Sequence, residues 1–386
     1  MPITLNASLL NTSILTGGGV LIDWEFINYM DDLVPVTMSG NTVKVDFSTN
    51  DTLNGTANSD DITTHNGNDQ AFGGLGNDIF HDKGLGNDQF FGGDGFDRFY
   101  LGAGSDTANG GAGTDTVDYT GIGLSLIADL KLGYAFAEGI DHFVGIENVV
   151  GTSWNDNIKG DDGMNDLKGA GGNDILSGRG GVDFLLGGDG NDTLLGFDGL
   201  NTDVGPRGPG LDDRLYGQGG NDTLMGDAGS DWLDGGIGDD TMNGGRGLDT
   251  LIGGGGNDKM TGGRDADTFI FNSKADMPRA DRITDFQHGV DKIDLSRIDA
   301  NPNVAGNQAF AFDWWGTPTT SGVVSVHPGP LIQGHTGHID VYYQGPPSGT
   351  VGPGHTWIYV ETNNNKTGAS ILLDGHVTIT ASDFIL

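Results

Sequence analysis

Residues 73–80 read Gly73-Gly74-Leu75-Gly76-Asn77-Asp78-Ile79-Phe80, and the same order of residues returns along most of the chain. It recurs with few changes at 187–194 (Gly-Gly-Asp-Gly-Asn-Asp-Thr-Leu) and at 253–260 (Gly-Gly-Gly-Gly-Asn-Asp-Lys-Met). All three stretches fit Gly-Gly-x-Gly-x-Asp-x-apolar-x, the pattern of a parallel β-helix repeat that binds Ca²⁺. The repeat therefore predicts an all-β, coiled architecture and a metal ion together.

The repeated aspartates fall into two blocks. In the first block every step is nine residues except one step of ten, and its members are Asp60, Asp69, Asp78, Asp88, Asp97, Asp106 and Asp115. A Gly/Pro-rich break at 205–210 interrupts the second block. The members of this block, which with the first block we call the ladder, are Asp156, Asn165, Asp174, Asp183, Asp192, Asn201, Asp213, Asp222, Asp231, Asp240, Asp249, Asp258 and Asp267. Because Asn165 and Asn201 lack a carboxylate, we expect their turns to bind a cation more weakly.

Composition supports a metal-dependent fold. The 386 residues include 71 Gly, carry a formal net charge of −36 and are only 35% hydrophobic. Of the 54 acidic residues only 4 are Glu, which leaves 54 − 4 = 50 Asp, the acid with the shorter side chain that is favoured in turns. Such a charge opposes compaction unless a cation neutralises it, and it disfavours nucleic acid and anionic membrane as direct partners. No stretch approaches the ~20 apolar residues of a membrane span.

The repeat has a simple mechanical interpretation. Six residues form a turn and three form a strand, so two repeats complete one coil of ~18 residues in a flattened roll with two parallel sheets. The apolar residue two after each Asp points inward, as for Ile62, Leu176, Leu194, Leu215, Leu224, Leu233 and Leu251. Ca²⁺ takes 6–8 oxygen ligands, and turn carbonyls plus one Asp from each of two stacked turns supply that set. We expect rows of calcium ions along both edges of the roll.

The predicted metal-site residues are the turn glycines and the ladder aspartates. In the first block they are Gly74, Gly76, Asp78, Gly93, Gly95, Asp97, Gly104, Asp106, Gly111, Gly113 and Asp115. In the second block they are Asp174, Asp183, Gly188, Gly190, Asp192, Asp213, Gly220, Asp222, Gly229, Asp231, Gly236, Gly238, Asp240, Gly245, Gly247, Asp249, Gly254, Gly256, Asp258 and Asp267. Zn²⁺ fits worse, since these repeats offer almost no His and the chain has no Cys, and Mg²⁺ tolerates carbonyl-rich cages poorly.

The repeats resemble those of the RTX (repeats-in-toxin) family of secreted bacterial proteins. The later segments 280–286, 289–295, 372–379 and 381–386 resemble the C-terminal region of the serralysin (M10) secreted peptidases. The resemblance implies extracellular localisation and export by a type I secretion ABC transporter. The last four residues, Asp383-Phe384-Ile385-Leu386, resemble the uncleaved signal that such a transporter reads, although an ordinary terminal strand is an alternative.

We expect five segments. Residues 1–50 contain no repeat, with a short helix over Trp24–Leu33 and a strand over Thr42–Phe47; residues 51–119 form the first RTX block; 120–150 form an intervening β segment; 151–271 form the second block; and 272–386 form a serralysin-like, β-sandwich-like cap. Neither residues 1–10 nor any later stretch reads as a Sec-type signal or a membrane helix.

Catalytic motifs are missing from the sequence. The His-Glu-x-x-His motif of the serralysin peptidases does not occur, and Gly-x-Ser-x-Gly does not occur in a strand–turn–helix context. Four histidines, His327, His335, His338 and His355, lie in an aromatic, Gly/Pro-rich stretch that favours surface loops over a metal or glycan site. Asp281, Asp285, Asp291 and Asp294 leave two interpretations open, a further calcium site or a cap on the last coil.

The sequence thus predicts a secreted, non-enzymatic calcium-binding protein that folds on Ca²⁺ outside the cell, with a role in adhesion, matrix or host contact and a cell-surface or polysaccharide ligand. The alternative is a divergent or detached part of an RTX secreted hydrolase, a protease or a polysaccharide-active enzyme, with its activity in 1–50 or 296–360.

Overall fold

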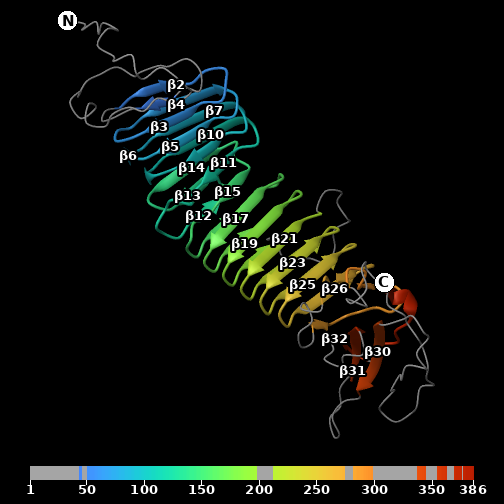
Figure 1. Ribbon diagram of the computed structural model, residues 1–386. Helices are drawn as coiled ribbons and strands as arrows, with labels where there is room; N and C mark the ends of the chain where they lie inside the picture. The colour runs from blue at the N-terminus through green and yellow to red at the C-terminus, as the bar shows by residue number, and fades with distance from the viewer. Residues whose placement is uncertain are drawn as a thin grey trace, which may run out of the picture.

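The computed structural model describes residues 50–197, 212–273, 281–298, 354–362, 369–375 and 377–386, together with the strands at 43–45 and 337–344. The predicted helix over Trp24–Leu33, the Asn201 turn and the Gly/Pro-rich break lie outside the described residues, as do His327 and His335. Within them the protein is all-β, as predicted, and forms an elongated roll whose coils stack from the first block to the C-terminal strands (Figure 1). No helix in the described part is long and apolar enough to cross a membrane.

One side of the roll is a 14-stranded parallel sheet, called sheet A here. Its strands, in spatial order, are β1 (Val43–Val45), β3 (Asp61–Thr64), β5 (Ile79–Asp82), β8 (Arg98–Tyr100), β11 (Thr116–Asp118), β15 (Asn148–Val150), β17 (Asp166–Gly171), β19 (Phe184–Asp189), β21 (Arg214–Gly219), β23 (Trp232–Ile237), β25 (Thr250–Gly255), β27 (Thr268–Ile270), β29 (Lys292–Asp294) and β33 (Phe384–Ile385).

The opposite side is sheet B, which is parallel except around β13 and at its C-terminal end. Its strands follow the order β2 (Thr52–Asn54), β4 (Gln70–Leu75), β7 (Gln89–Gly95), β10 (Thr107–Gly113), β14 (Ile140–Val144), β13 (Tyr134–Phe136), β12 (Ile127–Asp129), β16 (Asn157–Lys159), β18 (Ile175–Ser177), β20 (Thr193–Leu195), β22 (Thr223–Ala228), β24 (Thr241–Arg246), β26 (Lys259–Arg264), β28 (Asp281–Ile283), β32 (Ala369–Asp374), β31 (His355–Thr362) and β30 (Gly337–Gln344). A small pair, β6 (Leu85–Gly86) and β9 (Ala103–Gly104), joins two neighbouring turns.

The core consists of two rows of apolar side chains between the sheets, and each strand contributes one side chain to the row of its own sheet. In sheet A the register places Ile62 beside Phe80, Phe80 beside Phe99, and so on coil by coil to Phe269 and Ile293. The predicted inward residues are fully buried (Ile62, Leu176, Leu194, Leu215, Leu224, Leu233 and Leu251). Because the core is only two side chains wide, each coil buries little apolar surface, and the turns must contribute the rest of the stability.

The turn glycines let the coils stack closely. Gly74 has φ +114, and a Cβ on it would lie 2.2 Å from the carbonyl oxygen of Thr56 in the coil below. The same contact recurs at Gly236, where φ is +102 and a Cβ would lie 2.2 Å from the carbonyl oxygen of Gln218. An L side chain fits neither the backbone conformation nor the space, which explains why glycine recurs at this place.

Two segments interrupt the regular coil without breaking either sheet. Between Asp106 and Asp141 the chain runs through β12 and the antiparallel strand β13 before β14 returns to pair with β10. Around the Gly/Pro-rich break, β19 pairs directly with β21, with Phe184 opposite Arg214. The roll is therefore continuous across both predicted interruptions.

The C-terminal strands are built onto the same two sheets. β28 extends sheet B after β26, and the antiparallel strands β32, β31 and β30 follow it. β29 and β33 complete sheet A, and the 3₁₀ helix η4 (Ala381–Asp383) precedes β33. The cap therefore closes the open end of the roll, where sheet edges would otherwise be exposed.

Candidate metal centres in the turns

The ladder aspartates line the two edges of the roll in two rows. The row before sheet A contains Asp60, Asp78, Asp97, Asp115, Asp183, Asp213, Asp231, Asp249 and Asp267, and the row before sheet B contains Asp69, Asp88, Asp106, Asp141, Asp156, Asp174, Asp192, Asp222, Asp240 and Asp258. All of them are buried. Every predicted ligand aspartate lies in one of these rows, so the nine-residue period brings together residues about eighteen apart.

One carboxylate oxygen of each aspartate is held by the backbone. The amide of Asp222 donates to Oδ1 of Asp240 at 2.8 Å, and the amide of Asp240 donates to Oδ1 of Asp258 at 2.9 Å. The other row repeats the contact, from Asp213 to Asp231 at 2.7 Å and from Asp231 to Asp249 at 2.9 Å. These bonds fix the carboxylates in register and stack negative charge along each edge.

The second carboxylate oxygen is buried and receives no hydrogen bond from the described residues. This holds for Oδ2 of Asp69, Asp97, Asp106, Asp115, Asp174, Asp183, Asp192, Asp222, Asp231, Asp240 and Asp267. A buried carboxylate oxygen without a donor is costly, and one such atom in turn after turn indicates a partner of another kind.

The space beside this oxygen is bounded by backbone. A Cβ built on Gly235 would lie 2.3 Å from Oδ2 of Asp240 and 2.8 Å from the carbonyl oxygen of Gly253 in the next coil. The pattern repeats at the first glycine of other turns, including Gly73, Gly92, Gly169, Gly187 and Gly217. Our prediction from sequence did not include these first glycines, although the Gly-Gly pair of the repeat was the signal that could have identified them.

The predicted glycines have the expected turn geometry. All of them except Gly256 have positive φ. A Cβ on Gly256 would still lie 1.8 Å from the carbonyl oxygen of Gly238. These glycines keep the turns close together, whereas the first glycine keeps open the space at the carboxylate.

Burial and mutual repulsion raise the pKa of these carboxyl groups. Burial is the largest cause that raises the pKa of Asp231, and the negative charges of Asp249, Asp213 and Asp212 add to it, so this pKa rises to about 9. Burial and the neighbouring charges of Asp258 and Asp222 raise the pKa of Asp240 to about 7. A hard divalent cation among carboxylate and carbonyl oxygens would remove the cause of both shifts. The donor set, made only of oxygen, fits calcium.

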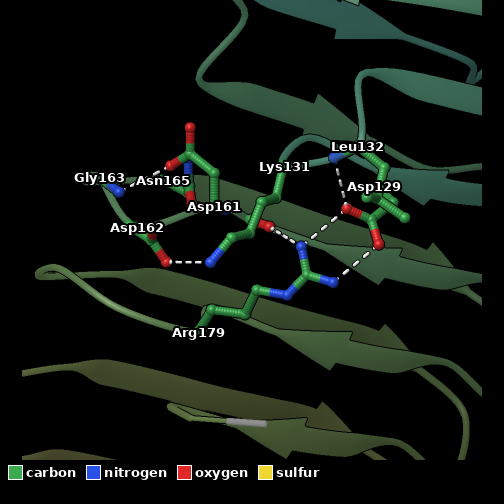
Figure 2. Close-up of polar contacts among 9 residues, drawn as sticks. Asp129, Lys131, Leu132, Asp161, Asp162, Gly163, Asn165 and Arg179 are labelled. Carbon is green, nitrogen blue, oxygen red and sulfur yellow. Dashed lines mark hydrogen bonds and ion pairs between the residues drawn. The ribbon is translucent and has the colours of Figure 1, made fainter. Parts of the chain in front are cut away.

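One turn departs from this arrangement because it holds Asn165 (Figure 2). The amide Nδ2 of Asn165 donates to the carbonyl oxygen of Glu147 at 2.8 Å, and its Oδ1 accepts from the amide of Asp161 at 2.8 Å. The side chain thus has a donor where Asp has an oxygen. This supplies a physical reason for the weaker cation binding that the sequence predicts at this turn.

Arg179 lies beside the same turn, at the place of a second glycine, with φ 76. Its guanidinium donates to both carboxylate oxygens of Asp129 at 2.7 Å and to the carbonyl oxygen of Gly160 at 2.7 Å (Figure 2). Burial would raise the pKa of Asp129, but the hydrogen bonds from Arg179 and Leu132 outweigh it and lower that pKa. At this turn the protein supplies its own positive charge.

In the first block, hydroxyl groups satisfy part of the row before sheet B. Thr64 Oγ1 donates to Oδ2 of Asp88 at 3.0 Å, and the buried Tyr119 donates its hydroxyl to Oδ2 of Asp141 at 2.7 Å. Thr64 and Tyr119 stand four residues after Asp60 and Asp115, where the second block has its first glycine. Side chains therefore replace the open space at these two carboxylates.

The four C-terminal aspartates hold backbone. Asp285 accepts from the amides of Gly262 and Gly263 at 3.0 and 2.8 Å, and Asp291 accepts from those of Asp267 and Gln287 at 3.1 and 2.7 Å. Asp281 accepts from Asp258, and Asp294 accepts from Ser296. Because Asp281 and Asp291 continue the contacts of the two rows, both interpretations, a further calcium site and a cap on the last coil, stay open.

The C-terminal tail forms the last rung of sheet A, with Phe384 beside Ile293. Asp383 is fully buried, and it accepts from the amide of Gly289 at 2.9 Å and lies 2.8 Å from Nδ1 of His288. Among the predicted histidines, His355 lies 3.3 Å from Asp374, which also pairs with Arg282. In the folded protein the tail is thus a strand of the roll.

Known protein families match this chain in two places. The RTX calcium-binding nonapeptide repeat matches residues 47–80 and 84–117. The Peptidase M10 serralysin C terminal family matches residues 110–315, which begins inside the roll and covers more than half of the chain. No curated protein matches the sequence.

Similar solved structures include two bacterial proteins. The AlgE6R3 subunit of the Azotobacter vinelandii mannuronan C5-epimerase is 22% identical, with a TM-score of 0.26, over 52% of this chain and 80% of that one. The extracellular lipase LipA of Serratia marcescens is 14% identical, with a TM-score of 0.22, over 86% of this chain and 39% of that one. With the repeat geometry and the family matches together, this chain belongs to the serralysin C-terminal (peptidase M10) family and carries RTX calcium-binding repeats.

Proposed function

We propose that this chain is a secreted, non-enzymatic protein whose roll folds only when calcium binds outside the cell. The observation that carries the proposal is the row of buried Oδ2 atoms that receive no hydrogen bond from the described residues. In calcium-poor cytosol these carboxylates repel one another, so the chain stays extended and suits passage through a type I secretion ABC transporter. Outside the cell, calcium cancels the charge and the coils stack.

The free energy available from calcium is sufficient for this role. A site at ten times its Kd adds RT ln 11, about 1.4 kcal/mol, so ten sites add about 14 kcal/mol. That sum is comparable with the whole stability of a typical domain. Calcium therefore decides whether the roll is folded, while the two-row apolar core decides which fold it adopts.

A calcium titration followed by circular dichroism tests the folding step. We expect a disordered spectrum in EDTA and a cooperative gain of β signal as calcium rises, with magnesium at the same concentration giving little change. A full β spectrum in EDTA at pH 7.5 would refute calcium-coupled folding.

Beyond folding, we place the protein at or outside the cell surface, in adhesion, matrix or host contact through a surface or polysaccharide ligand. The alternative, part of a secreted RTX hydrolase, draws support from the family match, because that family is named for the C-terminal region of a peptidase. Incubation of the calcium-loaded protein with casein, with mannuronan and with an ester substrate separates the two. Product formation above a heat-treated control would favour the enzyme.

A further inference from the structure

The row before sheet B contains an acidic group that the nine-residue repeat does not account for. Asp82 stands four residues after Asp78, in the column where the second block has its first glycine, and in sheet A it lies beside Thr64. Asp82 lies within the single ten-residue step of the first block, from Asp78 to Asp88. The column reads Thr64, Asp82, Leu101 and Tyr119, so only Asp82 puts a carboxylate into the space that glycine leaves open elsewhere.

Three carboxylates converge at this point. Asp82, Asp88 and Asp106 each bring an oxygen within 4.8 Å of the other two. Asp106 is fully buried, and its Oδ2 receives no hydrogen bond from the described residues. The remaining oxygens are partly held: Oδ1 of Asp106 accepts from the amide of Asp88 at 2.8 Å, and Oδ2 of Asp88 accepts from Thr64.

From this geometry we infer that Asp82, Asp88 and Asp106 form a three-carboxylate calcium site that is distinct from the two-carboxylate sites of the regular turns. Only oxygen donors converge, which is the ligand type calcium prefers. Three charges in place of two give this site the highest affinity along the roll, because ligand charge count tunes calcium affinity. The inference rests on the proposed calcium-binding role of the roll.

The surroundings support an ion rather than a simple contact. Asp82 is oriented by the backbone, since its Oδ1 accepts from the amide of Gly84 at 2.9 Å and its Oδ2 from that of Gly102 at 3.2 Å. It also lines a pocket formed with Lys83, Gly102, Asp118 and Glu138. Burial, then the charges of Asp82, Asp141 and Asp88, raise the pKa of Asp106 to about 8, the repulsion that a bound cation would relieve.

The competing arrangement is a proton shared between Asp82 and Asp106, and the tightest calcium-binding step distinguishes the two. We would compare the wild-type protein with Asp82→Asn and with Asp94→Asn, a control that removes an equal charge from an exposed turn position. Bound calcium is measured by atomic emission after equilibrium dialysis, and its tightest step by calorimetric titration. We expect Asp82→Asn to lose the tightest step, because its site falls to the affinity of the two-carboxylate sites, and Asp94→Asn to match the wild type.

Asp82→Leu provides a second variant, because the next coil already carries Leu101 in this column. An unchanged tightest binding step in either folded variant would overturn the three-carboxylate site. Failure of both variants to fold at saturating calcium would also contradict it, since the weakening of one site among many should leave the roll folded. A wild-type protein that binds no calcium would instead overturn the proposed function itself.

Discussion

The coils from Asp213 onward and those around the Asn165 turn solve the same electrostatic problem in different ways. At Asp222, Asp231 and Asp240 a buried carboxylate oxygen receives no hydrogen bond from the described residues. At the Asn165 turn a neutral amide replaces the carboxylate, and the Arg179 guanidinium adds a positive charge beside it. In the first block, the Tyr119 hydroxyl donates to Asp141. The difference teaches that calcium dependence is graded along one continuous roll.

The largest expected effect is a staged loss of structure as calcium is withdrawn. Residues 212–273 should lose amide protection at a higher free calcium concentration than residues 107–180, because the latter carry the Tyr119, Asn165 and Arg179 contacts. Hydrogen exchange followed by mass spectrometry in calcium-buffered solutions measures this. Loss of protection in both regions at one calcium concentration would show that the roll unfolds as a single unit and that the local contacts do not matter.

A second expectation concerns pH in the absence of calcium. The folded-state pKa values are raised, to about 9 for Asp231 and about 7 for Asp174 and Asp240, so the folded state binds more protons than the unfolded chain. Stability of the calcium-free roll should therefore be greatest near pH 4 and fall as pH rises towards 9. Circular dichroism in EDTA between pH 4 and 9 checks the sign, and a calcium-free β signal that increases over this range would contradict it.

Glycine substitutions test whether the open space is the binding site. Gly235→Ala places a Cβ 2.3 Å from Oδ2 of Asp240, and we expect it to cost about 2–4 kcal/mol and to abolish calcium binding at that turn. Gly255→Ala is the matched control, because its Cβ meets nothing within 4 Å, and it should change stability by less than about 0.5 kcal/mol. Equal effects in denaturant unfolding with calcium present would mean that the space has no special role.

Arg179→Gly tests the charge that the protein supplies itself. The change restores a glycine to its turn, yet it leaves the nearly buried Asp129 without its partner, so we expect a loss of about 2–4 kcal/mol even at saturating calcium. The exposed Lys131–Asp162 pair is the control, and Lys131→Ala should cost less than about 1 kcal/mol. If calcium rescued Arg179→Gly completely, the guanidinium would be no more than a placeholder for the metal.

The smallest expected effect is that of Asp240→Asn on the stability of the roll, and its sign should depend on whether calcium is present. Asp240→Asn removes one ligand charge, so at ten times Kd it should cost about 1.4 kcal/mol. In EDTA the same substitution should stabilise the roll, because it removes a repelling charge from the row. Asn165→Asp is the converse change, and in EDTA it should destabilise, since it loses the 2.8 Å bond to Glu147. Denaturant unfolding with calcium, and the size of the β signal by circular dichroism in EDTA, decide the signs.

The sequence determined the repeat unit, the inward residues and the identity of the ladder aspartates. A strict nine-residue period leaves each residue only one place in a coil, so Ile62 and Leu233 had to point inward and Asp78 and Asp240 had to line an edge. The family resemblance followed from the same residues. Local pattern suffices wherever neighbouring coils are copies of one another, because each coil packs only against its neighbours.

The tertiary structure alone decided which carboxylates stay open. Thr64 reaches an aspartate 24 residues away, Arg179 reaches one 50 residues away, and Asp82 meets Asp88 and Asp106 across two stacked turns. The strand insert between Asp106 and Asp141 likewise returns to the same sheet, which no local signal required. These contacts depend on how irregular segments stack on regular coils. The nine-residue repeat does not describe the irregular segments, so it could not predict their contacts.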